Sequence, residues 1–322
     1  MHNAVNCIVL ALALIAPAFG AAGPDYPVRP VRIIVGFPAG SGTDMLARFV
    51  GAKLTERLGK QVVVDNRPGA NGIIAAELTA KALPDGHTVL FMSISHTMNA
   101  AVYHKLPFDT VRSFTPVTTL ASGPLVLVAN NAFPSSSVQG LIELARAKPN
   151  TITYAVSGTG GINHFAGAMF ARIAGVRLVN VPYKGAPQAL TDLVSGQVQV
   201  MFGTAAITLS QIRSGRLKAL GVSSAKRSPL LPEVPTIIES GVPGYEMSTW
   251  WGVLAPAGLP AAIVARLNSE IGLVLGQPDF AQRFAADGAV PTPSGSAEFG
   301  RMLAAEVEKW RRIAREADIK AE

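Results

Sequence analysis

The feature that most constrains the fold of this chain is an alternation of strand-like and helix-like segments that occurs twice. In the first half, VRIIV is followed by a glycine-containing loop and a helical pattern, and QVVVD and TVLFMS come after it. In the second half, TITYAV, the glycine loop SGTGG, RLVNVP and QVQVMFG follow the same order of parts. Strands that alternate with helices are typical of parallel α/β sheets. The repeat therefore predicts two lobes of similar architecture.

Hydrophobic periodicity predicts strands and helices along most of the chain. We expect an α/β fold of two lobes, each a mainly parallel sheet flanked by helices. The predicted strands are 31–35, 61–65, 88–93, 125–129, 151–156, 177–182, 197–202, 217–223 and 250–255. The predicted helices are 44–58, 73–83, 138–148, 165–174, 186–195, 206–214, 261–275 and 296–317.

The chain has to pass between the two lobes, and two apolar segments can carry it. PLVLV at 124–128 is the predicted outward crossing, and WWGVLA at 250–255 is the predicted return. Two crossing strands form a hinge that permits closure around a ligand. The expected domains are 24–124 with 250–322 for lobe 1, and 125–249 for lobe 2.

The N-terminal segment is typical of a secretory signal peptide. The first 23 residues contain no Lys, Arg, Asp or Glu, and an apolar run at 8–15 precedes Pro17 and the small residues AFGAA. We predict a signal peptide at 1–22, cleaved near residues 20–23. A membrane anchor is the alternative, but the apolar run is short for a span. Cys7 lies in this segment and is the chain's single cysteine, which favours a periplasmic protein without disulfides.

Composition and motifs exclude several function classes. The formal net charge is +7, but the densest basic cluster, at 309–315, alternates with glutamates and indicates a solvated helix face rather than a nucleic-acid site. The histidines lie on separate segments without the spacing of metal ligands. Nucleotide P-loop, nucleophile-elbow and zinc-protease motifs are missing from the sequence. We therefore expect no metal, no cofactor, no nucleic-acid partner and no enzymatic activity.

Two glycine loops that each precede a helix predict anion-binding sites. In the first loop, Gly40 and Gly42 leave the backbone accessible, and the helix start supplies unpaired N–H groups and a favourable dipole. In the second, GTGGIN at 158–163 resembles a dinucleotide fingerprint, but it ends in Asn, and the following strand lacks a terminal acid. A second anion-binding helix start, with hydroxyls from Ser157 and Thr159, fits these residues better.

Other residues near these loops allow two interpretations. Asp44 either caps the first helix or orients a loop or water, and we favour capping and orientation because a carboxylate repels an anion. Tyr183 and Lys184 form either an exposed turn or a loop that closes over a ligand. The segment 203–206 contains no carboxylate, so we expect a carboxylate ligand without an amine, with an apolar or hydroxylated body.

Dense, ordered motifs over almost the whole mature chain resemble the Bug receptors, the solute-binding components of tripartite tricarboxylate transporters. They include VRIIVGFPAGSGTD, VVVDNRPGANG, LPDGHTVLF, YAVSGTGG, VPYKGAPQALTDLVSGQV, SGRLKALGVSSAKRSPLLPEVPTIIESGVPGYE and WWGVLAPAGLP. The resemblance implies a two-lobed periplasmic binding protein of the Venus-flytrap, type II-like kind. It also implies a small carboxylate held between the lobes by both glycine loops. Ser41 departs from the family's more usual second glycine and adds a hydroxyl.

From the motifs and the resemblance together we predict one ligand site built from both lobes. Its predicted residues are Phe37, Pro38, Ala39, Gly40, Ser41, Thr43, Asp44, Ser95, His96, Ser157, Gly158, Thr159, Gly160, Asn163, Tyr183, Lys184, Gly203, Thr204 and Ala205.

The leading hypothesis is a monomeric periplasmic receptor that delivers a small carboxylate to the membrane subunits of a tripartite tricarboxylate-type transporter. A ligand-sensing subunit for a signalling kinase is the first alternative, because transport and sensing use the same cleft. An exported two-domain enzyme is the second, and the missing nucleophile, base and metal signatures argue against it.

Overall fold

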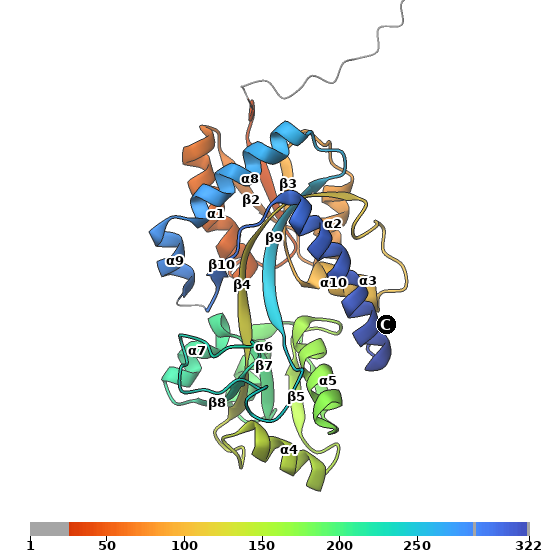
Figure 1. Cartoon of the computed structure of the whole chain (residues 1–322), viewed down its shortest axis with the longest axis vertical. Helices are drawn as coiled ribbons and strands as arrows, with labels where there is room; N and C mark the ends of the chain where they lie inside the picture. Colours follow the sequence, from red (N-terminus) through yellow and green to blue (C-terminus); the bar gives the residue numbers. More distant parts are fainter. Residues whose placement is uncertain (1–25, 286–287, 321–322) are drawn as a thin grey trace, which may run out of the picture.

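The computed structural model describes residues 26–285 and 288–320, and the predicted signal peptide at 1–22 lies outside this part of the chain. Figure 1 shows two α/β lobes along the long axis of the molecule. Two long strands run between the lobes, β4 (Phe114–Asn130) and β9 (Ser248–Pro256). The predicted α/β class with two lobes is thereby confirmed.

The lobe 1 sheet is built around β1 (Val31–Val35), whose apolar residues are almost all buried. β1 pairs in parallel with β2 and β3, so the loops that follow these strands emerge at one edge. β3 pairs antiparallel with β9, which in turn pairs antiparallel with the first part of β4. The remaining strands of this sheet are β2 (Val62–Asn66), β3 (Thr88–Ser93) and β10 (Val290–Pro291), which pairs with β4.

The lobe 2 sheet repeats the parallel arrangement. β5 lies between β6 and β7 and is parallel to both, whereas β7 and β8 pair antiparallel with the second part of β4. β4 pairs with β9 up to Pro124 and with β7 from Leu125, so this one strand connects the two sheets. The lobe boundaries given above stay a prediction. The strands are β5 (Thr153–Val156), β6 (Val179–Pro182), β7 (Val200–Thr204) and β8 (Leu217–Val222).

Helices flank both sheets, as Figure 1 shows. In lobe 1 they are α1 (Gly42–Leu58), α2 (Ile73–Ala80), α3 (Ser95–Val102), α8 (Ala261–Leu275), α9 (Pro278–Ala285) and α10 (Ser296–Glu316), with a short 3-10 turn, η1 (Ala70–Gly72), before α2. In lobe 2 they are α4 (Val138–Ala147), α5 (Ile162–Ala174), α6 (Ala186–Val194) and α7 (Ala205–Arg213).

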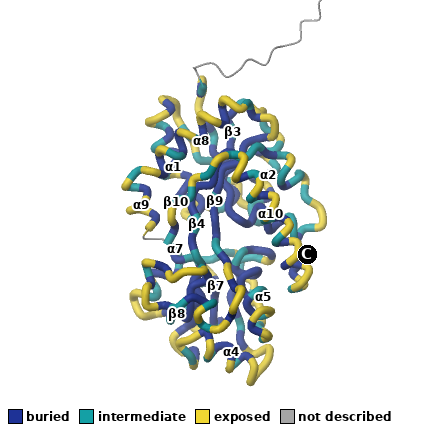
Figure 2. Tube along the Cα trace, viewed as in Figure 1, coloured by how far each residue is buried: buried dark blue, intermediate teal, exposed yellow. Residues whose placement is uncertain are grey.

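The hydrophobic core is continuous from one lobe to the other. Figure 2 shows buried backbone along β4 and β9 and into both lobes. One cluster of buried side chains includes Ile34 and Leu90 of lobe 1 together with Phe170 and Phe202 of lobe 2. α10 contributes Trp310, which is fully buried and packs edge-on against Phe165 of α5 with ring centroids 5.3 Å apart. α10 therefore begins on lobe 1 and ends against lobe 2.

Several predicted boundaries differ from the structure, and the reasons are local. Strand 125–129 is the second part of a longer β4, whose first part contains Pro116 and Pro124 and accommodates them with register shifts near Pro116. α1 begins at Gly42 rather than at 44 because Ser41 supplies the cap. α3, α9 and β10 were not predicted; α3 is rich in polar residues, SHTMN, that are buried here.

Candidate functional site

The loop after β1 leads directly into α1. Ser41 is the N-cap: its Oγ accepts from the N–H of Asp44 at 3.3 Å, and its carbonyl accepts from the N–H of Met45. Within the described residues, the N–H groups of Gly42 and Thr43 have no hydrogen-bond acceptor. They lie at the positive end of the helix dipole, which favours an anion.

Asp44 fixes the shape of this loop from inside. Its carboxylate accepts from the N–H of Gly40 at 2.8 Å, from Nδ2 of Asn66 at 2.8 Å, and from the guanidinium of Arg48. Burial acts to raise the pKa of Asp44, but the hydrogen bonds and the Arg48 charge outweigh it and hold the pKa below its usual value. The carboxylate is therefore ionised and fully engaged by the protein. It orients the loop, which agrees with the second role considered for it above, while the cap itself is Ser41.

A second anchor of the loop comes from the end of β2. Nδ2 of Asn66 also donates to the carbonyl of Phe37 at 3.1 Å, and Oδ1 of Asn66 accepts from Arg48 at 2.9 Å. Gly40 has a φ of +81°, and a Cβ at this position would meet nothing within 4 Å. The backbone at Gly40 is thus open to approach, while Phe37, Pro38 and Ala39 form the connection from β1.

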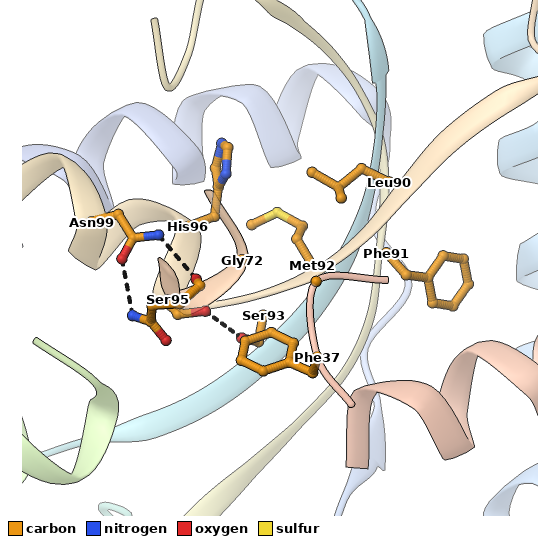
Figure 3. A pocket seen from close by; sticks show the side chains of 11 residues that line it. Phe37, Gly72, Leu90, Phe91, Met92, Ser93, Ser95, His96 and Asn99 are labelled. Atoms are coloured by element: carbon orange, nitrogen blue, oxygen red, sulfur yellow. Dashed lines mark hydrogen bonds between the residues drawn. The ribbon is translucent and has the colours of Figure 1, made fainter. Parts of the chain in front are cut away.

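Polar side chains gather at the same edge of lobe 1, after β2 and β3. Asn99 is hydrogen-bonded to Asn71, and Figure 3 shows Ser95 paired with Ser93 beside the ring of Phe37. They line a cavity of about 10 Å³, which is room for roughly one water molecule. These side chains largely satisfy one another, so their main effect is to hold the loops after β2 and β3 in place.

His96 also lines this cavity, and its ring lies in an aromatic cluster. Its ring is buried, stacks with Phe108 at 5.7 Å between centroids, and meets Phe114 edge-on. Nε2 lies 3.0 Å from the carbonyl of Thr110, and burial lowers the pKa of His96 to about 4. Its ring thus belongs to an aromatic cluster and is neutral at pH 7, so we do not retain it in the proposed site.

In lobe 2, the loop after β5 leads into α5 in a matching way. Gly161 is the N-cap, and within the described residues the N–H groups of Ile162 and Asn163 have no acceptor. The side chain of Asn163 accepts from the Ser157 hydroxyl and donates to the carbonyl of Phe202. Asn163 therefore ties the loop after β5 to the end of β7. Thr159 and Gly158 lie at the tip of this loop, where a Cβ at Gly158 would meet nothing within 4 Å.

His164 holds this loop in place through hydrogen bonds. Its Nδ1 accepts from the N–H of Gly160 at 3.2 Å, and its Nε2 lies 2.9 Å from the side-chain amide of Asn180. Burial lowers the pKa of His164. A neutral ring that accepts at Nδ1 is therefore part of the loop's structure, a role the sequence did not predict.

The other predicted lobe 2 residues follow β6 and β7. Burial, together with a hydrogen bond to Asp192, raises the pKa of Tyr183, so its hydroxyl is directed to α6 of its own lobe. Lys184 is exposed. Gly203, Thr204 and Ala205 connect β7 to α7, and Thr204 is the N-cap of α7.

The loop edges of the two lobes meet in the structure. A Cβ at Gly160 would lie 2.7 Å from Cγ2 of Val102, at the end of α3. A Cβ at Gly288 would lie 2.6 Å from Cβ of Ala205, at the start of α7. Both glycines therefore sit where one lobe approaches the other. Gly160 belongs to the second loop, so this loop faces lobe 1 at Val102.

Two further features of the described residues bear on the kind of site. Among the described residues, no group of three or more His, Cys, Asp or Glu side chains is placed to hold a metal ion. In the same part of the chain, no helix combines the length and the apolar character needed to cross a bilayer.

The chain matches the family described as "Tripartite tricarboxylate transporter family receptor" over residues 46–319. It belongs to this receptor family. The family resemblance predicted from the motifs is therefore confirmed, and the family consists of solute-binding receptors rather than enzymes.

Solved structures of related receptors agree with this assignment. Rpa4515 of R. palustris with adipate is 37% identical, covers 92% of this chain and 99% of its own, and gives a TM-score of 0.86. The periplasmic binding protein BugD is 33% identical, with coverage of 92% and 100% and a TM-score of 0.83. MatC (Rpa3494) from Rhodopseudomonas palustris with bound malate is 31% identical, with coverage of 89% and 99% and a TM-score of 0.81. The chain is a solute-binding protein of this periplasmic type.

In this family member, the side chains that shape the site were only partly predicted. Asn66 reaches the first loop, and Asn71 reaches Asn99 of α3, through tertiary hydrogen bonds that no local pattern encodes. Arg48 contacts Asp44 within α1, but its bond to Asn66 is tertiary as well. The motif NRPGANG marks a turn after β2, and that signal could have indicated Asn66 and Asn71. Trp251 lies in the predicted return strand, but its contact with Thr43 depends on strand pairing.

Proposed function

We propose that this receptor captures a small carboxylate between its two lobes and delivers it to the membrane subunits of a tripartite tricarboxylate-type transporter. The observation that carries the proposal is the pair of helix N-termini, one from each lobe, whose first N–H groups have no acceptor within the described residues. The second of them follows Gly160, which approaches Val102 at the end of α3 in lobe 1. Backbone N–H groups at a helix start are well suited to a carboxylate.

Some residues of the proposed site contact the ligand, and others hold the loops in place. Thr43, Gly42 and the backbone of the loop 37–41 form the lobe 1 side. Ser157, Thr159 and the start of α5 form the lobe 2 side, with 203–205 beside it. Asp44 and His164 support these loops without contacting the ligand. The same proposal includes three further expectations. Lobe 1 consists of 24–124 with 250–322, and lobe 2 of 125–249. The protein is exported to the periplasm after removal of 1–22, and it is a monomer.

The related structures support a carboxylate ligand, since one contains adipate and another malate. The state of Asp44 supports a ligand without an amine. Its carboxylate is occupied by Gly40, Asn66 and Arg48, so it is not available to an ammonium group.

Binding is tested by calorimetry and thermal shift on the mature protein with adipate, malate and their 2-amino analogues. A ligand at a hundred times its dissociation constant is expected to stabilise the fold by roughly 2.7 kcal/mol. We expect the carboxylates to bind more tightly than the amino analogues. Tighter binding of the amino acids would refute the interpretation that the Asp44 carboxylate is unavailable to an ammonium group of the ligand. Following the ligand by NMR during incubation tests for turnover, and conversion in proportion to protein would exclude a simple receptor.

Delivery is tested by uptake of labelled ligand in cells that express transporter membrane subunits with or without this receptor. Receptor-dependent uptake supports the transport role. Binding without any such uptake, but with a change in kinase signalling, would favour the sensing alternative.

A further inference from the structure

Trp251 lies on β9 at the place where the lobe 1 loops converge. It pairs in register with Ser93, the last residue of β3, and with Ala121 of β4. Successive side chains on a strand point to opposite faces. Accordingly Trp250 packs into the core beside α10, whereas Trp251 packs beside α1. Trp251 is thus the one whose ring reaches the start of α1.

The ring borders the proposed anion site directly. Nε1 of Trp251 donates to Oγ1 of Thr43 at 3.1 Å. Its Cζ2 lies 3.9 Å from the position that a Cβ on Gly42 would occupy. Because the unpaired N–H groups belong to Gly42 and Thr43, a carboxylate held there would place its next carbon atoms within van der Waals reach of the indole.

The hydrogen bond to Thr43 also has a directional effect. A hydroxyl has one donor and two acceptor positions, and the indole N–H occupies an acceptor position of Thr43. The hydroxyl proton of Thr43 is therefore left to donate elsewhere, and a carboxylate oxygen is a suitable acceptor. Trp251 thus contributes both an apolar wall and an orienting contact.

The polar side chains near this wall are already engaged with one another. Ser93 pairs with Ser95, and Asn71 pairs with Asn99. Asp44 is fully occupied. A hydroxyl group on the ligand body would have to compete with these pairs for their donors and acceptors, which would cost binding free energy.

We propose that Trp251 is a specificity-determining residue, and that it selects carboxylates whose body is apolar, either an alkyl chain or an aromatic ring, over hydroxylated ones. This inference rests on the proposed function, since it assumes that the carboxylate lies at the start of α1. It narrows the ligand class beyond the apolar or hydroxylated body expected from the sequence.

The structure also supplies a spectroscopic readout. Among the tryptophans, Trp250 and Trp310 are buried, with 5% and 0% of their surface exposed, whereas Trp251 keeps intermediate exposure. A ligand that covers the indole should change the fluorescence of Trp251 and leave the other two nearly unaffected.

The experiment titrates the mature protein with adipate, terephthalate and malate by calorimetry and by tryptophan fluorescence. The parent protein is expected to bind adipate or terephthalate at least roughly tenfold more tightly than malate, in line with the transfer of several apolar carbons from water. W251A should reduce this preference by at least about fivefold. W251F should keep most of the preference, because the ring remains, but should lose the fluorescence change. W250F, on the opposite face, is the matched control and should keep both.

Each outcome has a distinct meaning. If calorimetry detects no binding of any of these carboxylates, the proposed function fails together with this inference. If carboxylates bind but malate binds as well as adipate, or if W251A keeps the preference, the inference is overturned while the receptor function stands. A fluorescence change that persists in W251F would likewise overturn it. Circular dichroism of each variant establishes that it is folded.

Discussion

At the scale of single residues, the state of Asp44 connects loop geometry to binding. Its ionised carboxylate accepts from the Gly40 N–H, from Asn66 and from Arg48. Asp44→Asn keeps the shape but removes the charge, so one acceptor position is lost and Arg48 loses its counter-charge. Hydrogen bonds to charged groups contribute about 1.5–3 kcal/mol, so we expect a loss of stability of that order and a clear fall in ligand affinity.

The control for this variant is Asp109→Asn. Asp109 also accepts from backbone N–H groups and from an arginine, but these partners are residues 111 and 112, outside both glycine loops. We expect a loss of stability without a change in affinity. Urea denaturation and calorimetry measure the two quantities separately, and equal affinities for parent and Asp44→Asn would show that the first loop does not hold the ligand.

The buried histidines predict a pH dependence of stability. Burial lowers the pKa of His96 from 6.5 to about 4, and it lowers the pKa of His164 as well. In the unfolded chain these rings take up a proton near pH 6.5, whereas in the folded protein they resist it. The stabilisation is therefore complete above pH 6.5 and is lost as the pH falls toward 4. For His96 alone it amounts to about 3 kcal/mol.

Urea denaturation between pH 7 and pH 4.5 tests this dependence. His96→Gln removes one titrating group, so its stability should fall less steeply over the same range even though it starts lower. A slope identical to that of the parent protein would show that His96 is accessible to protons in the folded state.

At the scale of elements, the two serine caps offer a matched pair. Ser41 caps α1 at the proposed site, and Ser137 caps α4 on the far side of lobe 2 through the N–H of Gly140. Replacing either with Ala should cost roughly 1 kcal/mol of stability. Only Ser41→Ala should also weaken ligand binding, since it alone orients N–H groups that face the ligand. If both variants bind like the parent in calorimetry, α1 does not form the anion site.

Local patterns predicted the elements that depend on local chemistry. The VRIIV strand and the glycine loops follow from apolar runs and turn residues, and they appear at the predicted places. The first half of β4 was missed because TPVTTLASGP carries the residues of a turn, and only pairing with β9 holds it extended. In the same way, the contacts of Asn66 and Trp251 depend on which strands become neighbours, which no single segment reveals.

At the scale of the whole molecule, the shared core predicts cooperative unfolding. One buried cluster joins side chains of both lobes, and α10 crosses between them with Trp310 against Phe165 and an ion pair from Glu316 to Arg172. We expect a single urea transition in which fluorescence and far-ultraviolet circular dichroism coincide. Trp310→Ala should lower the unfolding free energy by about 3–5 kcal/mol. Two separate transitions in the parent protein would show that the lobes are energetically independent.

The path of α10 has a mechanical consequence. A helix packed against both lobes limits how far the lobes can separate on the side where the helix lies. In Figure 1 α10 and α5 lie on one side of the molecule, and α7 and α9 lie on the other, where Gly288 meets Ala205. We therefore expect the lobes to part further on the side of α7 and α9 than on the side of α10, so that the ligand of the proposed site would enter from there.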